Sequence, residues 1–174
     1  MRVAILTTGG TIEKTYNEAD GSLRNVGSVL QHLLAKLRLP SLTIRHVPVM
    51  SKDSLDMTEE DRRVVHEAVE RVLQSDDAVL VVHGTDTLSL TGDYLCERLP
   101  ALRKPVVLTG AMRPYEFRDT DALQNMTEAL LACRLMPPGV YVAMHNQVLR
   151  FPGVAKDHER MTFSAARRDP VRSA

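Results

Sequence analysis

The sequence predicts an α/β fold in which a doubly wound, mostly parallel sheet carries helices on both faces. Five short apolar runs alternate with segments of helical periodicity, from a first strand near the amino terminus to a fifth near residue 140. Such alternation implies right-handed crossovers and a parallel sheet covered by helices. The chain has 174 residues, which is the size of one ordinary domain. We therefore expect a single flavodoxin-like domain.

The expected strands are short and strongly apolar. Residues 79–82 are four consecutive hydrophobic residues before a polar corner, which is typical of a strand buried on both faces. Residues 42–47 instead alternate apolar and polar side chains. The remaining expected strands are residues 3–6, 105–108 and 140–144.

The expected helices follow from apolar residues at three- and four-residue steps, and occupy residues 29–37, 59–73, 87–98 and 119–135. Ser28 is the expected cap of the first helix and Pro40 its expected end. Thr58 is the expected cap of the second, with acidic residues in its first turn. Thr85 and Asp86 are the expected caps of the third.

Two polar segments have the character of hairpins. Residues 13–26 contain Asn17, Asp20 and Gly21 without helical periodicity, which indicates a hairpin or a mobile loop that could fold over a site as a lid. Residues 145–163 have Pro152 and Gly153 near their middle. Residues 164–174 have little to bury, and we expect this tail to fray.

The composition disfavours several classes of partner. Lys plus Arg equals Asp plus Glu at 22 each, so the charge balance suggests neither a nucleic-acid nor an anionic membrane partner. No apolar run approaches the roughly 20 residues that span a bilayer, and the amino terminus turns polar at Thr7, too early for a signal peptide. We expect a cytoplasmic protein. Cys96 and Cys133 are expected to be buried thiols, and no metal site is expected.

Polar corners follow three of the expected strands, at residues 7–12, 51–58 and 83–87. Because ligands bind outside the carboxyl ends of parallel strands, the three corners should open onto one edge of the sheet. A phosphate-binding loop is the competing interpretation of the first corner, but its glycines match neither Gly-x-Gly-x-x-Gly nor a P-loop. At the third corner, a capped helix start explains one of Thr85, Asp86 and Thr87 but not all three.

Four ordered motifs resemble signatures of the bacterial-type L-asparaginase and glutaminase family: Thr8-Gly9-Gly10-Thr11-Ile12, Asp53-Ser54-Leu55-Asp56-Met57, His83-Gly84-Thr85-Asp86-Thr87 and Leu108-Thr109-Gly110-Ala111-Met112-Arg113-Pro114. The resemblance runs from Val3 to about Phe163 and corresponds to the amino-terminal domain of the usual two-domain member. It implies a catalytic domain over residues 1–163. The usual second domain, which follows that point, is expected to be absent from this chain.

The resemblance also implies roles for individual residues. Thr11 is the implied nucleophile, and Tyr16 on the mobile segment is its activating partner. Thr85 is the second essential threonine. Lys156 falls at the catalytic lysine of a Thr-Lys-Asp triad, in which Asp86 is the acid. Without the resemblance, Tyr16 could also be an exposed aromatic residue of a loop, and Lys156 could be an ordinary surface lysine.

The substrate-binding residues are implied in the same way. Asp86 would bind the α-ammonium group of the substrate and Ser54 would help to hold its α-carboxylate. Leu55, Thr85 and Gly10 complete the implied binding set. His83, His145 and His158 have no partners at metal-ligand spacing and are interpreted as structural or incidental.

The activity implied by the resemblance is hydrolysis of L-asparagine to L-aspartate and ammonia, with L-glutamine as a second substrate and no cofactor. A homodimer or homotetramer is also implied, since the family's site lies between subunits. One alternative is a non-catalytic amino-acid-binding or assembly protein. Another is a component of an amidotransferase that supplies ammonia to a tRNA-bound substrate, which the lack of a basic bias disfavours.

Overall fold

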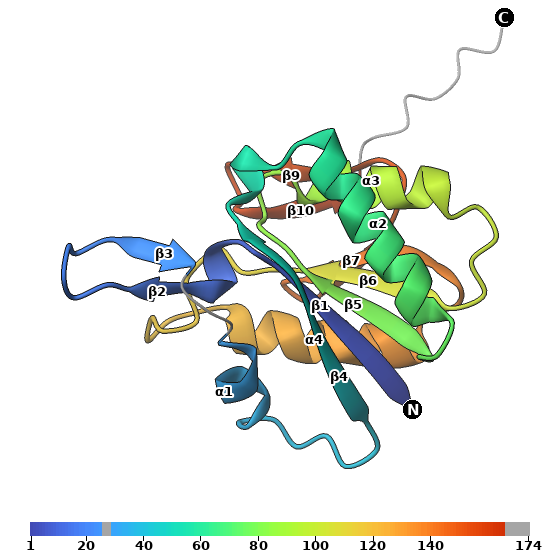
Figure 1. Ribbon diagram of the computed structural model, residues 1–174, viewed down its shortest axis with the longest axis horizontal. Coiled ribbons are helices and arrows are strands. Elements are labelled where there is room, and N and C mark those ends of the chain that lie inside the picture. Colours follow the sequence, from blue (N-terminus) through green and yellow to red (C-terminus); the bar gives the residue numbers. More distant parts are fainter. Residues whose placement is uncertain (26–28, 166–174) are drawn as a thin grey trace, which may run out of the picture.

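A six-stranded sheet forms the centre of the computed structural model, which describes residues 1–25 and 29–165. The strand order is β4-β1-β5-β6-β7-β8 (Figure 1). The first five of these strands are parallel, and β8 pairs antiparallel with β7. The parallel strands have the flavodoxin-like order, so the predicted fold class is confirmed. The strands are β1 (Arg2–Gly9), β4 (Thr43–Lys52), β5 (Ala78–Val82), β6 (Pro105–Thr109), β7 (Gly139–Met144) and β8 (Gln147–Arg150).

Helices cover both faces of the sheet (Figure 1). The helices α2 (Glu59–Leu73) and α3 (Leu88–Arg98) pack on one face, and α1 (Leu30–Leu34) and α4 (Ala122–Leu135) on the other. Successive side chains of a strand point to opposite faces, so every residue of β5 is buried against one helical layer or the other. The predicted double burial of this strand is confirmed.

The helix ends differ from the predicted ones in two places. The helix α1 stops at Leu34, and the chain continues in tight turns in which the N–H groups of Lys36 and Leu37 donate to carbonyls three residues back. The expected end at Pro40 is therefore wrong, and Ser28 lies outside the described residues. The helix α4 begins at Ala122 because the carboxylate of Asp121 turns back to bind the loop after β6.

Of the three expected cap residues that the structure describes, one is confirmed in that role. Thr58 forms a capping box with Asp61, since each side chain accepts a hydrogen bond from the other residue's backbone N–H. At α3 the N-cap position belongs to Thr87, which makes no side-chain cap hydrogen bond. The side chains of Thr85 and Asp86 contact Lys156 instead, so the expected capping role of these two residues is wrong.

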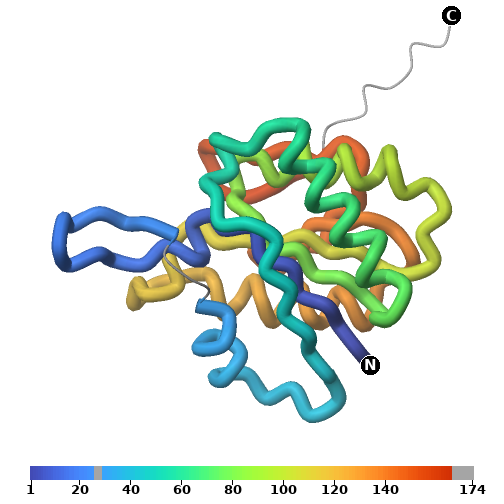
Figure 2. The backbone as a smooth tube through the Cα atoms, in the orientation of Figure 1, coloured from blue at the N-terminus to red at the C-terminus, as the bar shows by residue number. Residues whose placement is uncertain are grey.

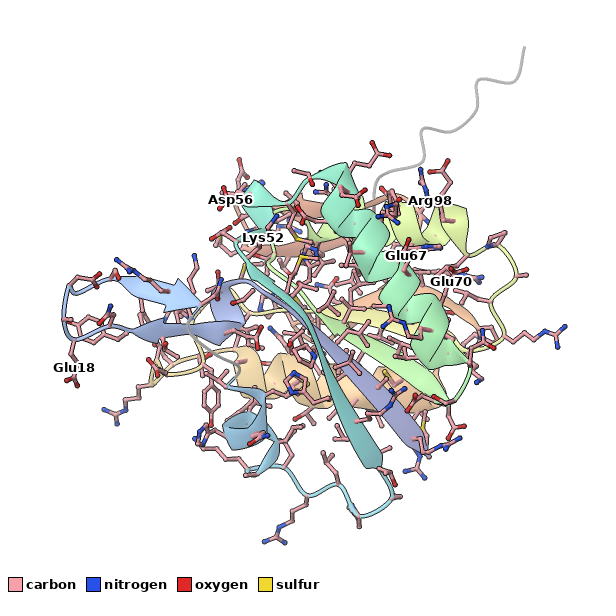
Figure 3. All side chains as sticks on the ribbon, in the orientation of Figure 1. Glu18, Lys52, Asp56, Glu67, Glu70 and Arg98 are labelled. Carbon is pink, nitrogen blue, oxygen red and sulfur yellow. The ribbon has the colours of Figure 1, made fainter. Side chains whose placement is uncertain are left out.

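Both polar segments contain hairpins. The strands β2 (Lys14–Tyr16) and β3 (Leu23–Asn25) form one that extends from the body of the protein (Figures 1 and 2), with Glu18 at its outer end (Figure 3). The second comprises β9 (Val154–Asp157) and β10 (Thr162–Ala165). Ser164 and Ala165 pair with β9, so the expected fraying is wrong for these two residues. Residues 166–174 lie outside the described part.

No helix in the described part of the chain is long and apolar enough to cross a membrane. Cys96 and Cys133 are free thiols. Cys133 is buried, and burial raises the pKa of its thiol to about 12. Within residues 1–25 and 29–165, no three His, Cys, Asp or Glu side chains gather in a way that could hold a metal ion.

Candidate active site

Three corners of the chain meet closely at the carboxyl ends of β4, β1 and β5. Gly10 follows β1 with φ 85°, and a Cβ atom on it would lie 2.4 Å from the Cα atom of Gly84. A Cβ atom on Gly84 would in turn lie 2.6 Å from Oγ of Ser54. Only glycine permits such contacts. The three polar corners predicted from the sequence are thus brought to one edge of the sheet.

A lysine, a threonine and an aspartate are joined at this edge. Lys156 in β9 donates from Nζ to Oγ1 of Thr85 at 2.9 Å and to Oδ1 of Asp86 at 2.6 Å. Its side chain is only 8% exposed, so Lys156 is not an ordinary surface lysine. Thr85 is buried, whereas Asp86 remains accessible from solvent. The cluster therefore places an ammonium group, a hydroxyl group and a carboxylate within reach of a small ligand.

Ser54 begins the short 3-10 helix η2 (Ser54–Asp56) after β4. It is 1% exposed, and its Oγ atom has no hydrogen-bond partner among the described residues. Its carbonyl accepts a hydrogen bond from Thr87, and Asp53 accepts one from the N–H of Leu55. The ion pair with Lys14 lowers the pKa of Asp53. The next residue, Leu55, is 71% exposed.

Thr11 and Tyr16 belong to two successive short elements after the first corner. Thr11 starts the 3-10 helix η1 (Thr11–Glu13) directly after Gly10, and it is half-buried. Tyr16 lies in β2 with a side chain that is 59% exposed, and its backbone N–H donates to Glu116. Of the hydrogen bonds in the described ranges, none joins these two residues. Hydrogen bonds thus join Lys156, Thr85 and Asp86, whereas the pairing of Tyr16 with Thr11 stays a prediction.

His83 is a buried residue of this edge, which the sequence indicated only as structural or incidental. It is 0% exposed and directly precedes Gly84. Its Nδ1 atom lies 2.7 Å from the carbonyl oxygen of Gly84, and its Nε2 atom lies 2.9 Å from Oγ1 of Thr91 in α3. Burial lowers the pKa of the imidazole to about 4, so it is neutral near pH 7. The one feature of the sequence that could have indicated this residue is its position between a buried strand and a glycine.

A second polar network lies beside the cluster. The carboxylate of Asp121 accepts hydrogen bonds from the N–H groups of Met112 and Arg113, from Asn125 and from Nε2 of His145. Burial opposes ionisation, but these donors hold the pKa of Asp121 below its usual value. The sequence offered no motif for this network. A cavity of about 220 Å³ borders it, lined by Met112, Arg113, Asp119, Asp121, His145 and Met161.

A larger cavity lies at the other end of the sheet. It measures about 420 Å³ and is bounded by the last turns of α2 and α3 and by the loop that leads into β6. Glu70 and Arg98 belong to its lining (Figure 3). None of the predicted site residues lines it.

The fold and the site together define a flavodoxin-like α/β protein with threonine hydroxyls, a buried lysine and an aspartate at the carboxyl edge of its sheet. The chain belongs to the asparaginase family, because the family model "Asparaginase, N-terminal" matches residues 2–173. This match extends past residue 163, the expected end of the domain.

Individual relatives agree with this assignment. The L-asparaginase of Thermococcus kodakarensis is 30% identical over 158 residues, which are 91% of this chain and 48% of that protein. The solved structure of the thermostable L-asparaginase from Thermococcus kodakarensis superposes with a TM-score of 0.88, covering 95% of this chain and 51% of that one. A glutamyl-tRNA(Gln) amidotransferase component from the same organism is 30% identical over an alignment of 151 residues, which covers 83% of this chain and 33% of that protein. The chain spans about half the length of the asparaginases it matches.

Proposed function

We propose that this protein is an amidohydrolase that converts L-asparagine to L-aspartate and ammonia through a threonine nucleophile. The observation that carries the proposal is the cluster in which Lys156 contacts both Thr85 and Asp86 at the carboxyl edge of the sheet. The names of its relatives support the choice of substrate. Neither a metal nor an organic cofactor takes part in the proposed reaction.

The substrate-binding residues would be those that offer charge or an unused hydrogen bond. Asp86 uses Oδ1 for Lys156, so we assign its Oδ2 atom to the α-ammonium group of asparagine. Ser54 has a buried hydroxyl without a partner in the described part of the chain, and we assign it to the α-carboxylate. We also assign Gly10, Thr85 and Leu55 to the binding site. A buried hydroxyl that lacks a partner costs stability, which a bound carboxylate would restore.

In the proposed reaction, Oγ1 of Thr11 attacks the carbon of the side-chain amide while a base removes the hydroxyl proton. The base then gives this proton to the amide nitrogen as the C–N bond of the tetrahedral intermediate breaks, so ammonia leaves and an ester of Thr11 remains. Water then hydrolyses the resulting ester and regenerates the threonine. Tyr16 is the proposed base, and because it is exposed on β2 its role requires the β2–β3 hairpin to fold over the site. Lys156 would orient the Thr85 hydroxyl.

The negative oxygen of the intermediate needs hydrogen-bond donors. Backbone N–H groups near Gly10, Thr85 and Ala111 are the candidates. The N–H groups of Thr85 and Ala111 are better supported than that of Gly10, because within the described residues they donate to no other group, whereas the N–H of Gly10 donates to the carbonyl of Lys52. Removing one donor to such an oxygen typically costs about 10²- to 10³-fold in kcat.

The family resemblance supports two finer parts of the proposal, a homodimer or homotetramer and L-glutamine as the poorer substrate. We also propose a cytoplasmic location. A non-catalytic amino-acid-binding protein is the principal alternative. Supply of ammonia to a tRNA-bound substrate is a second one, which the similarity to the amidotransferase component favours.

Ammonia release from L-asparagine, and separately from L-glutamine, tests the proposal. The wild-type protein should release ammonia from asparagine, and Thr11→Ala and Thr85→Ala should abolish turnover while calorimetry still detects binding of L-aspartate. Folded protein that binds L-aspartate but releases no ammonia from either amide would identify the binding-protein alternative. Release from glutamine alone would favour a glutaminase or a component of an amidotransferase.

A further inference from the structure

His83 bridges the end of β5 and the helix α3 behind the candidate site. Its backbone N–H donates to the carbonyl of Thr109, which joins this residue to β6. Its ring lies between the carbonyl oxygen of Gly84 and the hydroxyl of Thr91, and both His83 and Thr91 are fully buried. Solvent therefore cannot replace either hydrogen bond of the ring.

The two partners fix which ring nitrogen carries the proton. A carbonyl oxygen only accepts hydrogen bonds, so Nδ1 must be the donor to Gly84. The ring is neutral near pH 7, so Nε2 is an acceptor and accepts a hydrogen bond from the hydroxyl group of Thr91. His83 thus holds the carbonyl of Gly84 toward the buried space between β5 and α3.

This contact also fixes the direction of the next N–H group. The peptide bond between Gly84 and Thr85 is trans, and in a trans peptide the C=O and N–H bonds point in opposite directions. The N–H of Thr85 therefore points away from α3, and within the described residues it has no hydrogen-bond partner. Rotation of this peptide would carry the donor away from the site.

We propose that His83 is a positioning residue, whose Nδ1–H group aims the backbone N–H of Thr85 at the oxygen that becomes negative in the reaction. The inference rests on the proposed amide hydrolysis. It differs from a role in filling space, because it depends on one nitrogen atom of the ring. His83 touches no reacting atom and acts through the Gly84 carbonyl.

Two amide substitutions separate these roles. His83→Asn keeps a donor near the position of Nδ1, whereas His83→Gln carries its amide to the position of Nε2. We expect His83→Asn to keep kcat within about 5-fold of wild type, and His83→Gln to lower kcat about 10²-fold, as expected for a misaimed transition-state donor. KM for asparagine should change little in both. Equal kcat values in the two variants, or losses that follow their unfolding temperatures, would overturn the proposal.

Nuclear magnetic resonance supplies a readout that does not need activity. In ¹⁵N-labelled wild-type protein, Nδ1 of His83 should carry the proton from pH 6 to pH 8, and the amide resonance of Thr85 should shift in His83→Gln but not in His83→Asn. A proton on Nε2, or a Thr85 resonance that is the same in both variants, would refute the positioning role. Absence of ammonia release from wild-type protein would instead refute the proposed function, whatever these spectra show.

Discussion

The Nζ atom of Lys156 lies 2.9 Å from Oγ1 of Thr85, although 71 residues separate them in the sequence. The contact depends on the β9–β10 hairpin, whose strand β9 packs against α3, the helix that follows the corner carrying Thr85. Gly92 of α3 leaves room for the ring of Phe151, and Asp93 accepts a hydrogen bond from the N–H of Gly153. These contacts fix the turn before β9 against α3 and so position Lys156 at the site.

Replacement of Lys156 by methionine, which has a similar volume, should leave the fold intact and remove the ammonium group from Thr85. We expect kcat for asparagine to fall by about 10²-fold, because the Thr85 hydroxyl would lose the group that orients it. Steady-state ammonia release measures this decrease.

Lys104→Met is the matched control, because Lys104 donates to the carbonyls of Leu73 and Asp76 far from the site. It should cost about 1 to 3 kcal/mol of stability and leave kcat unchanged. Equal activity of the two variants would contradict the role of Lys156.

The sequence carries enough information for the sheet and for its polar edge. The four apolar residues of 79–82 require burial on both faces, and the structure buries them. The three corners meet because parallel strands place their carboxyl ends together. The length of α1 could not be predicted, since the leucines at 33, 34 and 37 suit a helix or a series of turns equally. The residues around Lys156 are not distinctive, so its position followed from the resemblance. The role of His83 depends on the direction of one carbonyl group, which no periodicity reveals.

Substitution of Gly10 by alanine should destabilise the protein far more than the same change at Gly21. Gly10 has φ 85° and ψ −179°, a conformation almost confined to glycine, and a Cβ atom would overlap the backbone of Gly84. We expect a loss of about 3 to 5 kcal/mol, from strain and overlap together. Gly21 also has positive φ, but its nearest neighbour would be 3.8 Å away, so Gly21→Ala should cost only about 1 to 2 kcal/mol. Urea unfolding measures the loss of stability in both variants. Similar losses would show that the backbone at Gly84 moves easily to make room for a side chain at Gly10.

The buried imidazole of His83 should make stability depend on pH. Its pKa is about 4 in the folded protein and about 6.5 in an unfolded chain. Between these values the unfolded state binds more protons, so the free energy of unfolding decreases as pH falls from about 6.5 toward 4 and is constant with respect to this group above that range. Carboxyl groups titrate in the same range, so the comparison is with His83→Asn. The stability of wild type relative to this variant should fall by about 2 kcal/mol between pH 7 and pH 4.5. A difference that does not vary with pH would mean that the pKa of the ring is the same in the folded protein as in the unfolded chain.

Removal of the Ser54 hydroxyl should weaken binding without weakening the fold. The Oγ atom is buried and, among the described residues, has no hydrogen-bond partner, so Ser54→Ala loses no internal hydrogen bond and should be as stable as wild type or more stable by up to about 1 kcal/mol. If the hydroxyl binds the α-carboxylate, the Kd for L-aspartate should rise about 10-fold, the equivalent of 1.4 kcal/mol. Thr58→Ala is the control on the same segment, because it removes the α2 cap and should cost about 1 kcal/mol of stability with no change in Kd. Urea unfolding and calorimetric titration separate the two effects, and an unchanged Kd in Ser54→Ala would remove Ser54 from the binding site.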